Sequence, residues 1–503
     1  MTSKNWPRLP RKKSSDSVKP ASHCRCDDGD DHTLPESSTY LDDHLPEEYF
    51  RQDLINLIHE MRMPGWSIVT LDMASDLDLV RISGATSNSV YWVKPPDYVK
   101  NMLKKDKSHT HRKPTNLLLR IYGLQIEHLI DRQQELATIA ELSQLHIGPR
   151  LLGTFANGRF EQFLNAKPLT KEQMRAPEVS VQIARRMREL HDRVPLSPEM
   201  RAEGACCFRN IKNWSVLAQD HLKHFEKKFP GITSQLMNYK YEDLDEQEAE
   251  SGLLPTPNSD IDYKNPELLS SKLNMDKLQQ PDPSVKKHTF PEFLDLINKY
   301  SELMKQKYKD EELVFCHNDT QYGNILRLEP PKGSPLLQPQ NEYRQLVVID
   351  FEYSGPNPRA FDIANHFCEW MNDYHHAEVP HHIWRNRYPP LADMELFVQA
   401  YVEHGERYFD DNKIAEQVDN LMKQIKDWTP IVNACWGLWG VVQMPTDEEY
   451  HIREEHIEKD PNYILTNAIA SPSLEPEETS EFDYFGYASQ KMSLFYHNLS
   501  EFS

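Results

Sequence analysis

Two short polar clusters in the second half of the chain have the residue types that phosphoryl transfer needs. Asp319 is followed five positions later by Asn324, and Asp350 ends the apolar run 347–349 with Glu352 close behind it. This chemistry needs a carboxylate that orients the attacking hydroxyl, and an amide and a second carboxylate that hold Mg²⁺. Asp319 is therefore the expected catalytic base. The expected metal ligands are Asn324, Asp350 and Glu352.

The order of the two clusters matches a spacing that protein kinases use. Kinases place an Asn five residues after the catalytic Asp, and a second Asp downstream at the end of a strand. Both relations hold in this chain. Each cluster alone has a structural alternative, because Asp also caps turns and ends buried strands. The ordered pair, with a strand between its members, favours catalysis.

Two segments nearer the N-terminus are candidates for contacting a nucleotide. Arg120 lies in the apolar run 117–122, and a cation buried there needs a partner, for which Glu135 is the candidate. The alternative is an Arg on an exposed sheet face with Glu135 in solvent. Between two strand-like runs, small residues would let backbone amides approach phosphates, although a hairpin turn without a ligand is the commoner meaning. These small residues are Ser83, Gly84, Ala85, Thr86, Ser87 and Asn88.

Aromatic residues near the C-terminus offer a site for a quaternary ammonium ion. Trp436 and Trp439 are three positions apart, so a helix would place both indoles on one face. Cation–π attraction can hold such an ion there, while core packing is the simpler interpretation of an isolated aromatic pair. A predicted helix over 362–374 and the last aromatic residues would add walls and one anion. The residues concerned are Glu369, Trp370, Tyr374, Phe482, Tyr484 and Tyr487.

Apolar periodicity predicts the elements that position these residues: a small β-rich lobe and then a larger, mainly helical one, in an α+β fold. A first helix begins near Glu47. Strand-like runs follow at 66–71, 79–83, 90–93, 117–122, 151–155 and 159–163, with a helix over 131–144. Later helices are predicted over 179–191, 214–229, 290–308, 362–373, 394–407 and 414–428.

The predicted organisation is a tail, two lobes and two insertions. Residues 1–45 have little apolar periodicity and are expected to be a disordered N-terminal tail. The nucleotide-binding lobe is expected over 46–163 and the catalytic lobe over 164–503. Acidic runs with Pro and Ser mark inserted surface stretches at 239–287 and 446–478.

Composition excludes several classes of protein. The formal net charge of −21 argues against nucleic acid binding, which needs a basic face, and favours a cationic substrate. The 7 Cys have no repeated pair spacing and no signal-peptide pattern opens the chain, so a cytoplasmic protein with reduced thiols is expected. The most apolar stretch, 431–444, is shorter than the roughly 20 residues of a membrane span, so none is expected.

Four motifs together resemble the choline/ethanolamine kinase family. They are H-N-D-x-x-x-G-N-I-L at 317–326, I-D-F-E-Y at 349–353, F-D-I-A-N-H-F-C-E-W at 361–370 and W-G-L-W at 436–439, in the family's order. The resemblance spans about 47–500 apart from the two insertions. It implies a two-lobed, protein-kinase-like fold that transfers the γ-phosphate of ATP to choline, with Mg²⁺. The product would be phosphocholine for phosphatidylcholine synthesis.

The resemblance also implies roles for individual residues. Asp319 resembles the catalytic base, Asn324 and Asp350 the metal ligands, Arg120 the ATP-phosphate residue, and 83–88 the nucleotide loop, although a second Gly is missing from that loop. Gln162 and Leu164 resemble an adenine-contacting hinge. Thr320 and Gln321, which follow His-Asn-Asp, resemble the residues of choline kinases more than those of ethanolamine kinases. The residues that resemble the choline pocket are Glu369, Tyr374, Trp436, Trp439 and Tyr487, to which Gln321 and Phe482 are added as substrate-binding candidates.

Alternatives and smaller expectations accompany this interpretation. Ethanolamine is a second candidate substrate, an aminoglycoside kinase is an enzymatic alternative, and a pseudokinase-like binding protein is a non-enzymatic one. A homodimer is compatible with the resemblance. The basic run before Ser14 and Ser15 resembles a protein-kinase site, although such a run in a tail is usually only solvated. No structural zinc is expected, because the His pairs at 375–376 and 381–382 and the Cys pair at 24 and 26 lack a four-ligand spacing.

Overall fold

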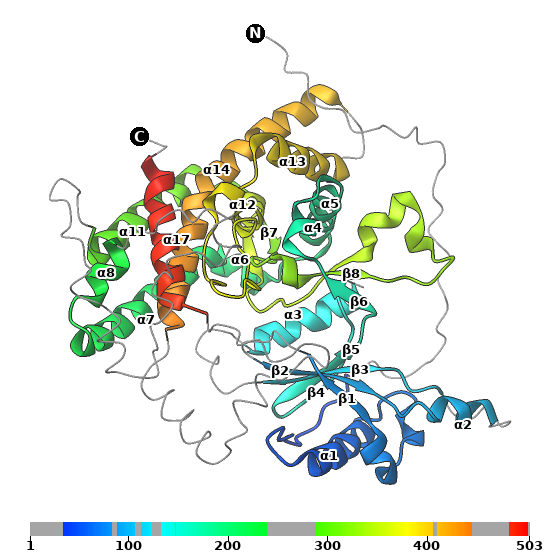
Figure 1. The fold of residues 1–503 in the computed structure, drawn as a ribbon. Helices are drawn as coiled ribbons and strands as arrows, with labels where there is room; N and C mark the ends of the chain where they lie inside the picture. The colour runs from blue at the N-terminus through cyan, green and yellow to red at the C-terminus, as the bar shows by residue number, and fades with distance from the viewer. Residues whose placement is uncertain are drawn as a thin grey trace. The chain divides into compact units, whose positions relative to one another are not determined.

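The computed structural model describes residues 34–82, 88–105, 112–122, 132–145, 147–238, 288–405, 410–444 and 482–500 (Figure 1). The predicted tail up to residue 33, both predicted insertions, the loop at 83–87 and the Ser14–Ser15 site lie outside these ranges. Contacts divide the chain into two units. The first contains 1–78, 93–121 and 151–161, and the second contains 79–92, 122–150 and 162–503.

The first unit combines a helix with three neighbouring strands. Helix α1 (Glu47–Glu60) buries Phe50, Leu54, Leu57 and Ile58, the helical periodicity that predicted it. Strands β3 (Leu117–Tyr122), β5 (Gly158–Gln162) and β4 (Leu151–Phe155) lie side by side in that order. Helix α2 (Val99–Lys105) belongs to the same part of the chain. The strands predicted at 151–155 and 159–163 are confirmed, and they pair antiparallel.

The strand predicted at 66–71 is wrong. Two 3₁₀ helices, η1 (Trp66–Ile68) and η2 (Leu71–Asp76), occupy this segment. The buried residues are Met63, Trp66 and Val69, a spacing of three that matches a 3₁₀ turn rather than the alternation of a strand. The indole of Trp66 donates a hydrogen bond of 2.9 Å to the Thr115 carbonyl, which fixes the turn.

The second unit contains the remaining strands and most of the helices. Strands β1 (Asp78–Arg81) and β2 (Asn88–Lys94) are neighbours, and α3 (Arg132–Gln144) contributes Leu142 to a core with Leu190, Phe315 and Phe351. The other helices are α4 (Lys171–Arg175), α5 (Pro177–Arg193), α6 (Pro198–Glu203), α7 (Cys206–Lys228), α8 (Ile232–Asn238), α11 (Phe290–Lys307), α12 (Arg359–Glu369), α13 (Leu391–Gly405), α14 (Asp411–Val442) and α17 (Tyr484–Ser500).

Two small antiparallel sheets interrupt these helices. Strand β7 (Leu313–Cys316) pairs with β10 (Gly355–Pro358). Strand β8 (Ile325–Leu328) pairs with β6 (Ala166–Pro168) on one side and with β9 (Leu346–Val348) on the other. Short 3₁₀ turns connect them or follow them: η3 (Tyr322–Asn324), η4 (Pro335–Leu337), η5 (Pro339–Gln345) and η6 (Arg385–Arg387).

Two helices differ from their predicted lengths. Helix α12 ends at Glu369, not at 373 or 374, and Asn372 pairs instead with Ile383 in an isolated bridge. Helix α14 continues far beyond 428, through Pro430 and both tryptophans of W-G-L-W. Figure 1 shows α17 running alongside α14, and the two are in contact. Among the described residues, each helix is too short or too polar to cross a membrane.

Candidate active site

The register of β8 and β9 brings together two of the three predicted metal ligands, Asn324 and Asp350. Ile325 lies opposite Val348, so the next pair outward is Asn324 and Ile349. The Ile349 N–H donates a hydrogen bond of 2.9 Å to the Asn324 carbonyl, which extends the pairing by one residue. Asp350 is the next residue along the chain. Two segments about 25 residues apart in sequence therefore meet at one end of this hairpin.

The pairing of β7 with β10 positions the loop that carries Asp319. Cys316 lies opposite Gly355, so the loop after β7 meets the loop before β10. The Asn318 side chain donates to the Tyr353 carbonyl at 2.9 Å. Asn318 and Asp350 both have positive φ, 65° and 67°. Asn and Asp tolerate this left-handed conformation better than most residues, and each starts a sharp turn directly after a strand.

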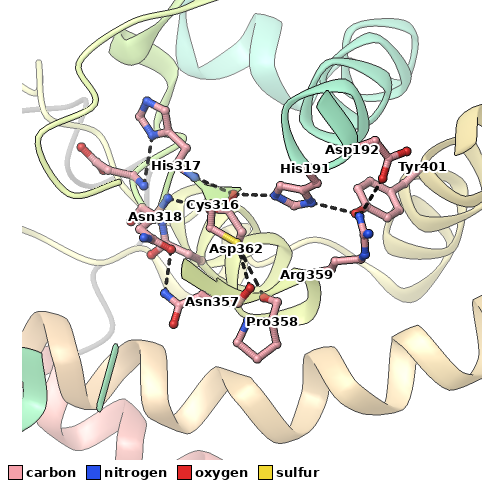
Figure 2. A network of polar contacts seen from close by, with 12 residues as sticks. His191, Asp192, Cys316, His317, Asn318, Asn357, Pro358, Arg359, Asp362 and Tyr401 are labelled. Carbon is pink, nitrogen blue, oxygen red and sulfur yellow. Dashed lines mark hydrogen bonds and ion pairs between the residues drawn. The ribbon is translucent and has the colours of Figure 1, made fainter. Parts of the chain in front are cut away.

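Asp362 of α12 holds the backbone of this loop (Figure 2). Its carboxylate is fully buried and accepts hydrogen bonds from the His317 N–H at 3.0 Å and the Asn318 N–H at 2.8 Å. The His191 Nε2 lies 2.9 Å from the same carboxylate. Burial alone would raise the pKa of Asp362, but the His191 hydrogen bond and the backbone donors outweigh it and lower the pKa. The ionised carboxylate thus fixes the loop geometry.

The network extends away from the loop through His191. Its Nδ1 lies 2.7 Å from the Tyr401 hydroxyl, which also accepts from Arg359 at 3.3 Å. Arg359 makes an ion pair with Asp192 at 2.9 Å. Figure 2 shows this chain running from α12 toward α5 and α13. Burial lowers the pKa of His191, so its imidazole is neutral at pH 7 and acts as a hydrogen-bond relay.

Polar residues on one face of α12 make hydrogen bonds to the loop of Asp319 and to Tyr374. Asp362, Asn365, His366 and Glu369 recur at helical spacing on a helix whose other residues are mostly apolar. The Asn365 amide donates to the Asn318 carbonyl at 2.9 Å, and His366 Nδ1 lies 2.9 Å from the Thr320 carbonyl. Of these four residues, only Glu369 is a candidate from the sequence alone. The polar period within F-D-I-A-N-H-F-C-E-W was the signal for the other three.

Asp319 lies at the centre of a group of carboxylates. Asn324 donates to the Asp319 Oδ2 at 2.7 Å and to its carbonyl at 3.0 Å. Partial burial raises the pKa of Asp319 well above its ordinary range, and the charges of Glu369, Asp350 and Glu352 raise it further. The predicted base, the predicted metal ligands and the predicted pocket anion are therefore close enough to interact.

The donor set at this end of the hairpin fits a hard divalent cation. The Asn324 Nδ2 is held by Asp319, which turns the amide oxygen in the opposite direction. Asp350 and Glu352 add carboxylate oxygens from the adjoining loop, and both act electrostatically on Asp319. Amide and carboxylate oxygens are the ligands that Mg²⁺ prefers, and a cation would relieve the repulsion among these carboxylates.

Aromatic rings from α14, α17, the segment just before α17 and two loops gather beside these carboxylates. We call these residues the aromatic cluster: Tyr353, Tyr374, Trp436, Trp439, Phe482, Tyr484 and Tyr487. The Trp436 and Trp439 rings lie 5.3 Å apart by centroid, and Trp439 lies 5.9 Å from Tyr487. Phe482 lies 5.4 Å from Tyr487 and 6.2 Å from Tyr374. The two indoles point into this group because α14 remains helical through Pro430.

A hydrogen bond joins the aromatic cluster to Asn365 of α12, the residue that also holds the Asn318 carbonyl in the loop of Asp319. The Trp436 indole donates to the Asn365 side-chain oxygen at 2.7 Å, and the Trp439 indole donates to the Tyr353 hydroxyl at 2.9 Å. Simple core packing, the alternative for an isolated Trp pair, does not account for these polar contacts with the site.

Glu369 is the buried anion of the aromatic cluster. It is 1% exposed and accepts hydrogen bonds from the Tyr374 hydroxyl at 2.7 Å and the Asn372 amide at 2.9 Å. Helix α12 ends at Glu369, and the chain after it turns so that the Tyr374 side chain contacts the Glu369 carboxylate. Burial and the Glu369 charge raise the pKa of Tyr374, so the phenol stays protonated as a donor. Asn372 was not foreseen from the sequence.

The predicted partners Arg120 and Glu135 belong to different units of the chain. Arg120 is 7% exposed, so the exposed-face alternative is wrong, and it pairs with Glu161 at 3.6 Å. Glu161, an unforeseen residue, also binds Arg159 at 2.6 Å. Glu135 is buried too, but in the second unit, so the predicted Arg120–Glu135 pair stays a prediction.

The predicted hinge and nucleotide loop are described only in part. The Gln162 side chain accepts a hydrogen bond from Arg150 at 3.2 Å, and Leu164 is half-buried. The Gln321 side chain accepts from the Gly323 N–H at 2.6 Å, a contact within its own turn. Residues 83–87 and the Asn88 side chain lie outside the described residues. The nucleotide-binding and substrate-binding assignments of these residues stay predictions.

Family models match almost the whole chain. Residues 79–496 match the model described as choline/ethanolamine kinase, and residues 28–75 match the choline kinase N terminus. The chain belongs to the choline/ethanolamine kinase family. It is 33% identical to a choline kinase of Saccharomyces cerevisiae, over 93% of this chain and 78% of that protein. A choline kinase of Schizosaccharomyces pombe is 32% identical, over 91% and 90%. An ethanolamine kinase of Saccharomyces cerevisiae is 30% identical, over 91% and 78%.

Solved structures of this family share the fold. The choline kinase from Cryptosporidium parvum Iowa II has a TM-score of 0.54 at 20% identity, covering 90% of this chain and 95% of that one. A Plasmodium vivax ethanolamine kinase has a TM-score of 0.51 at 18% identity, covering 91% and 93%. The predicted fold class, α+β and protein-kinase-like with a β-rich and a mainly helical lobe, is confirmed. The chain is a kinase, as its family assignment predicts.

Proposed function

We propose that this chain is an ATP-dependent choline kinase that transfers the γ-phosphate of ATP to the hydroxyl of choline. Relatives named choline kinase match more than nine-tenths of the chain, which supports choline as the acceptor. The decisive observation is that a buried carboxylate, Glu369, and the aromatic cluster lie beside Asp319. Rings with one anion suit a quaternary ammonium ion, and the adjacent carboxylate suits the hydroxyl of the same small molecule.

The chemistry of the site follows from its charges. The choline oxygen attacks the γ-phosphorus, the bond to the ADP oxygen breaks, and the hydroxyl proton passes to Asp319. Asn324 fixes the orientation of the Asp319 carboxylate through the 2.7 Å hydrogen bond. Burial is the largest cause of the raised pKa of Asp319, and it makes this carboxylate a better proton acceptor than an exposed Asp. Mg²⁺ held by Asn324, Asp350 and Glu352 would offset charge on the phosphate oxygens.

The direct test is coupled ADP release from the purified protein with Mg-ATP and one acceptor at a time. Choline-dependent release is the expected result, and the ratio of kcat/KM for choline to that for ethanolamine defines the preference. Ethanolamine is a second candidate because an ethanolamine kinase is among the relatives. Release with an aminoglycoside alone would contradict the proposal. ATP binding without release to any acceptor would support a pseudokinase instead.

Asp319→Asn tests the assignment of the base. We expect kcat to fall by at least about 10²-fold, the usual contribution of a general base, while the Kd for ATP stays within a few-fold. Asp295→Asn, at an exposed helical ion pair, is the matched control and should keep full activity. Near-normal turnover of Asp319→Asn would reject the assignment. A cytoplasmic location, a homodimer and phosphorylation at Ser14 or Ser15 stay expectations from the sequence.

A further inference from the structure

Helix α17 buries a charged side chain next to the aromatic cluster. Lys491 is 0% exposed, and across the described part of the chain its Nζ has no hydrogen-bond partner. Moving an ammonium ion out of water without a partner is strongly unfavourable. The proposed mechanism does not use Lys491, so its position needs another explanation.

Two groups near the site, the Tyr487 ring and the Cys368 thiol, interact with Lys491. Its Nζ lies 5.3 Å from the centroid of the Tyr487 ring, within the range of a cation–π contact. The lysine also acts on the thiol of Cys368: burial raises the pKa of that thiol to about 12, and the positive charge opposes the rise. Cys368 directly precedes Glu369 in α12. The ammonium ion therefore lies against one ring of the cluster and near the turn of α12 that carries Glu369.

The backbone holds Lys491 in this position. Gly437 lies within W-G-L-W, and a Cβ added to it would lie 3.6 Å from the Cβ of Lys491 and 3.1 Å from the Cγ of Met492. Helix α17 thus packs directly on the turn of α14 that carries Trp436 and Trp439. A side chain enclosed between these helices has few alternative rotamers, so its charge stays beside the aromatic cluster.

We propose that Lys491 is a built-in counter-ion of the aromatic cluster and that it lowers the affinity of this cluster for cationic substrates. The inference rests on the proposed function, in which a quaternary ammonium ion occupies the cluster. Without substrate, the lysine offsets the negative charge of Glu369. With substrate, two cations share one carboxylate and the Tyr487 ring. Lys491 therefore sets the KM for choline higher than the same rings would give alone.

The test compares a cation with its neutral isostere. Lys491→Met removes the charge at similar volume, and Lys491→Arg retains it. The two probes are choline and the neutral alcohol in which a tert-butyl group replaces the trimethylammonium group. The Kd of choline is measured by calorimetry, and that of the alcohol by competition with choline. A purely structural role would change both affinities together, whereas a charge effect changes the affinity for choline alone.

We expect Lys491→Met to bind choline about tenfold more tightly, the order of a unit charge acting over roughly 10 Å in a protein interior. Its affinity for the neutral alcohol should stay within about twofold of the wild type, and Lys491→Arg should resemble the wild type with both probes. An unchanged or weaker choline affinity of Lys491→Met, relative to the alcohol, would overturn the inference. Failure of the wild type to bind choline would overturn the proposed function and the inference with it.

A second pair of variants covers a folding defect. If Lys491→Met leaves Glu369 uncompensated and does not fold, the same substitution is made in a Glu369→Gln background. This double variant removes both charges and is compared with Glu369→Gln alone. The inference predicts that the double variant binds choline more tightly than Glu369→Gln, with no change for the neutral alcohol. Equal choline affinities would refute it.

Discussion

The hydrogen bonds of Asp362 give the strongest prediction about the loop of Asp319. Its buried carboxylate accepts from the His317 N–H at 3.0 Å, the Asn318 N–H at 2.8 Å and His191 at 2.9 Å. In Asp362→Asn, the amide oxygen can still accept a hydrogen bond from one of the two backbone N–H groups. The amide NH₂ group then faces the other backbone N–H, which loses its acceptor. A hydrogen bond to a charged group contributes about 1.5–3 kcal/mol, and an unsatisfied buried donor has a cost of similar size. We therefore expect the free energy of unfolding to fall by about 3–5 kcal/mol.

The same substitution should reduce turnover, although Asp362 does not touch the substrate. Loss of the backbone hydrogen bonds lets Asp319 shift, and a displacement of about 1 Å can cost roughly 10²-fold in rate. The assays are urea unfolding followed by tryptophan fluorescence, and kcat with choline at saturating Mg-ATP. Asp295→Asn, which breaks an exposed i,i+4 ion pair, is the control and should change stability by less than about 0.5 kcal/mol. A loss below about 1 kcal/mol with unchanged kcat for Asp362→Asn would refute this role.

Two further predictions concern stability. His366 is buried, and burial lowers its pKa in the folded protein from 6.5 to about 4. Its contribution to the free energy of unfolding is therefore complete above pH 6.5 and is lost as the pH falls toward 4. This shift corresponds to roughly 3 kcal/mol, and His366→Asn should flatten the pH dependence of the urea midpoint; an unchanged slope would contradict it. Gly440→Ala would place a Cβ 3.0 Å from the Cβ of Ala488. It should lower the thermal midpoint, with a destabilisation of about 1–2 kcal/mol, whereas a higher midpoint would show that helix propensity outweighs the contact.

The sequence predicted the elements whose pattern is local. The helix at 47–60 and the strand at 117–122 follow from burial at helical spacing and from an unbroken apolar run. At 66–71 the strand prediction is wrong because the buried residues are three apart rather than alternating, and a contact between Trp66 and distant Thr115 favours a 3₁₀ turn. The ends of α12 and α14 were also misjudged, because packing rather than local composition determines where each helix stops.

The sequence by itself determined the chemistry: a carboxylate, an amide and a second carboxylate in kinase order, an Arg in an apolar strand, and two indoles three apart. These depend on residue type and spacing, which a linear chain displays. The tertiary structure decided which groups share an environment. Only the pairing of β8 with β9 shows that Asn324 meets Asp350, and only the face of α12 shows that Asp362, Asn365 and Glu369 serve one site. Such contacts join residues far apart in sequence, and burial then sets the pKa of each group.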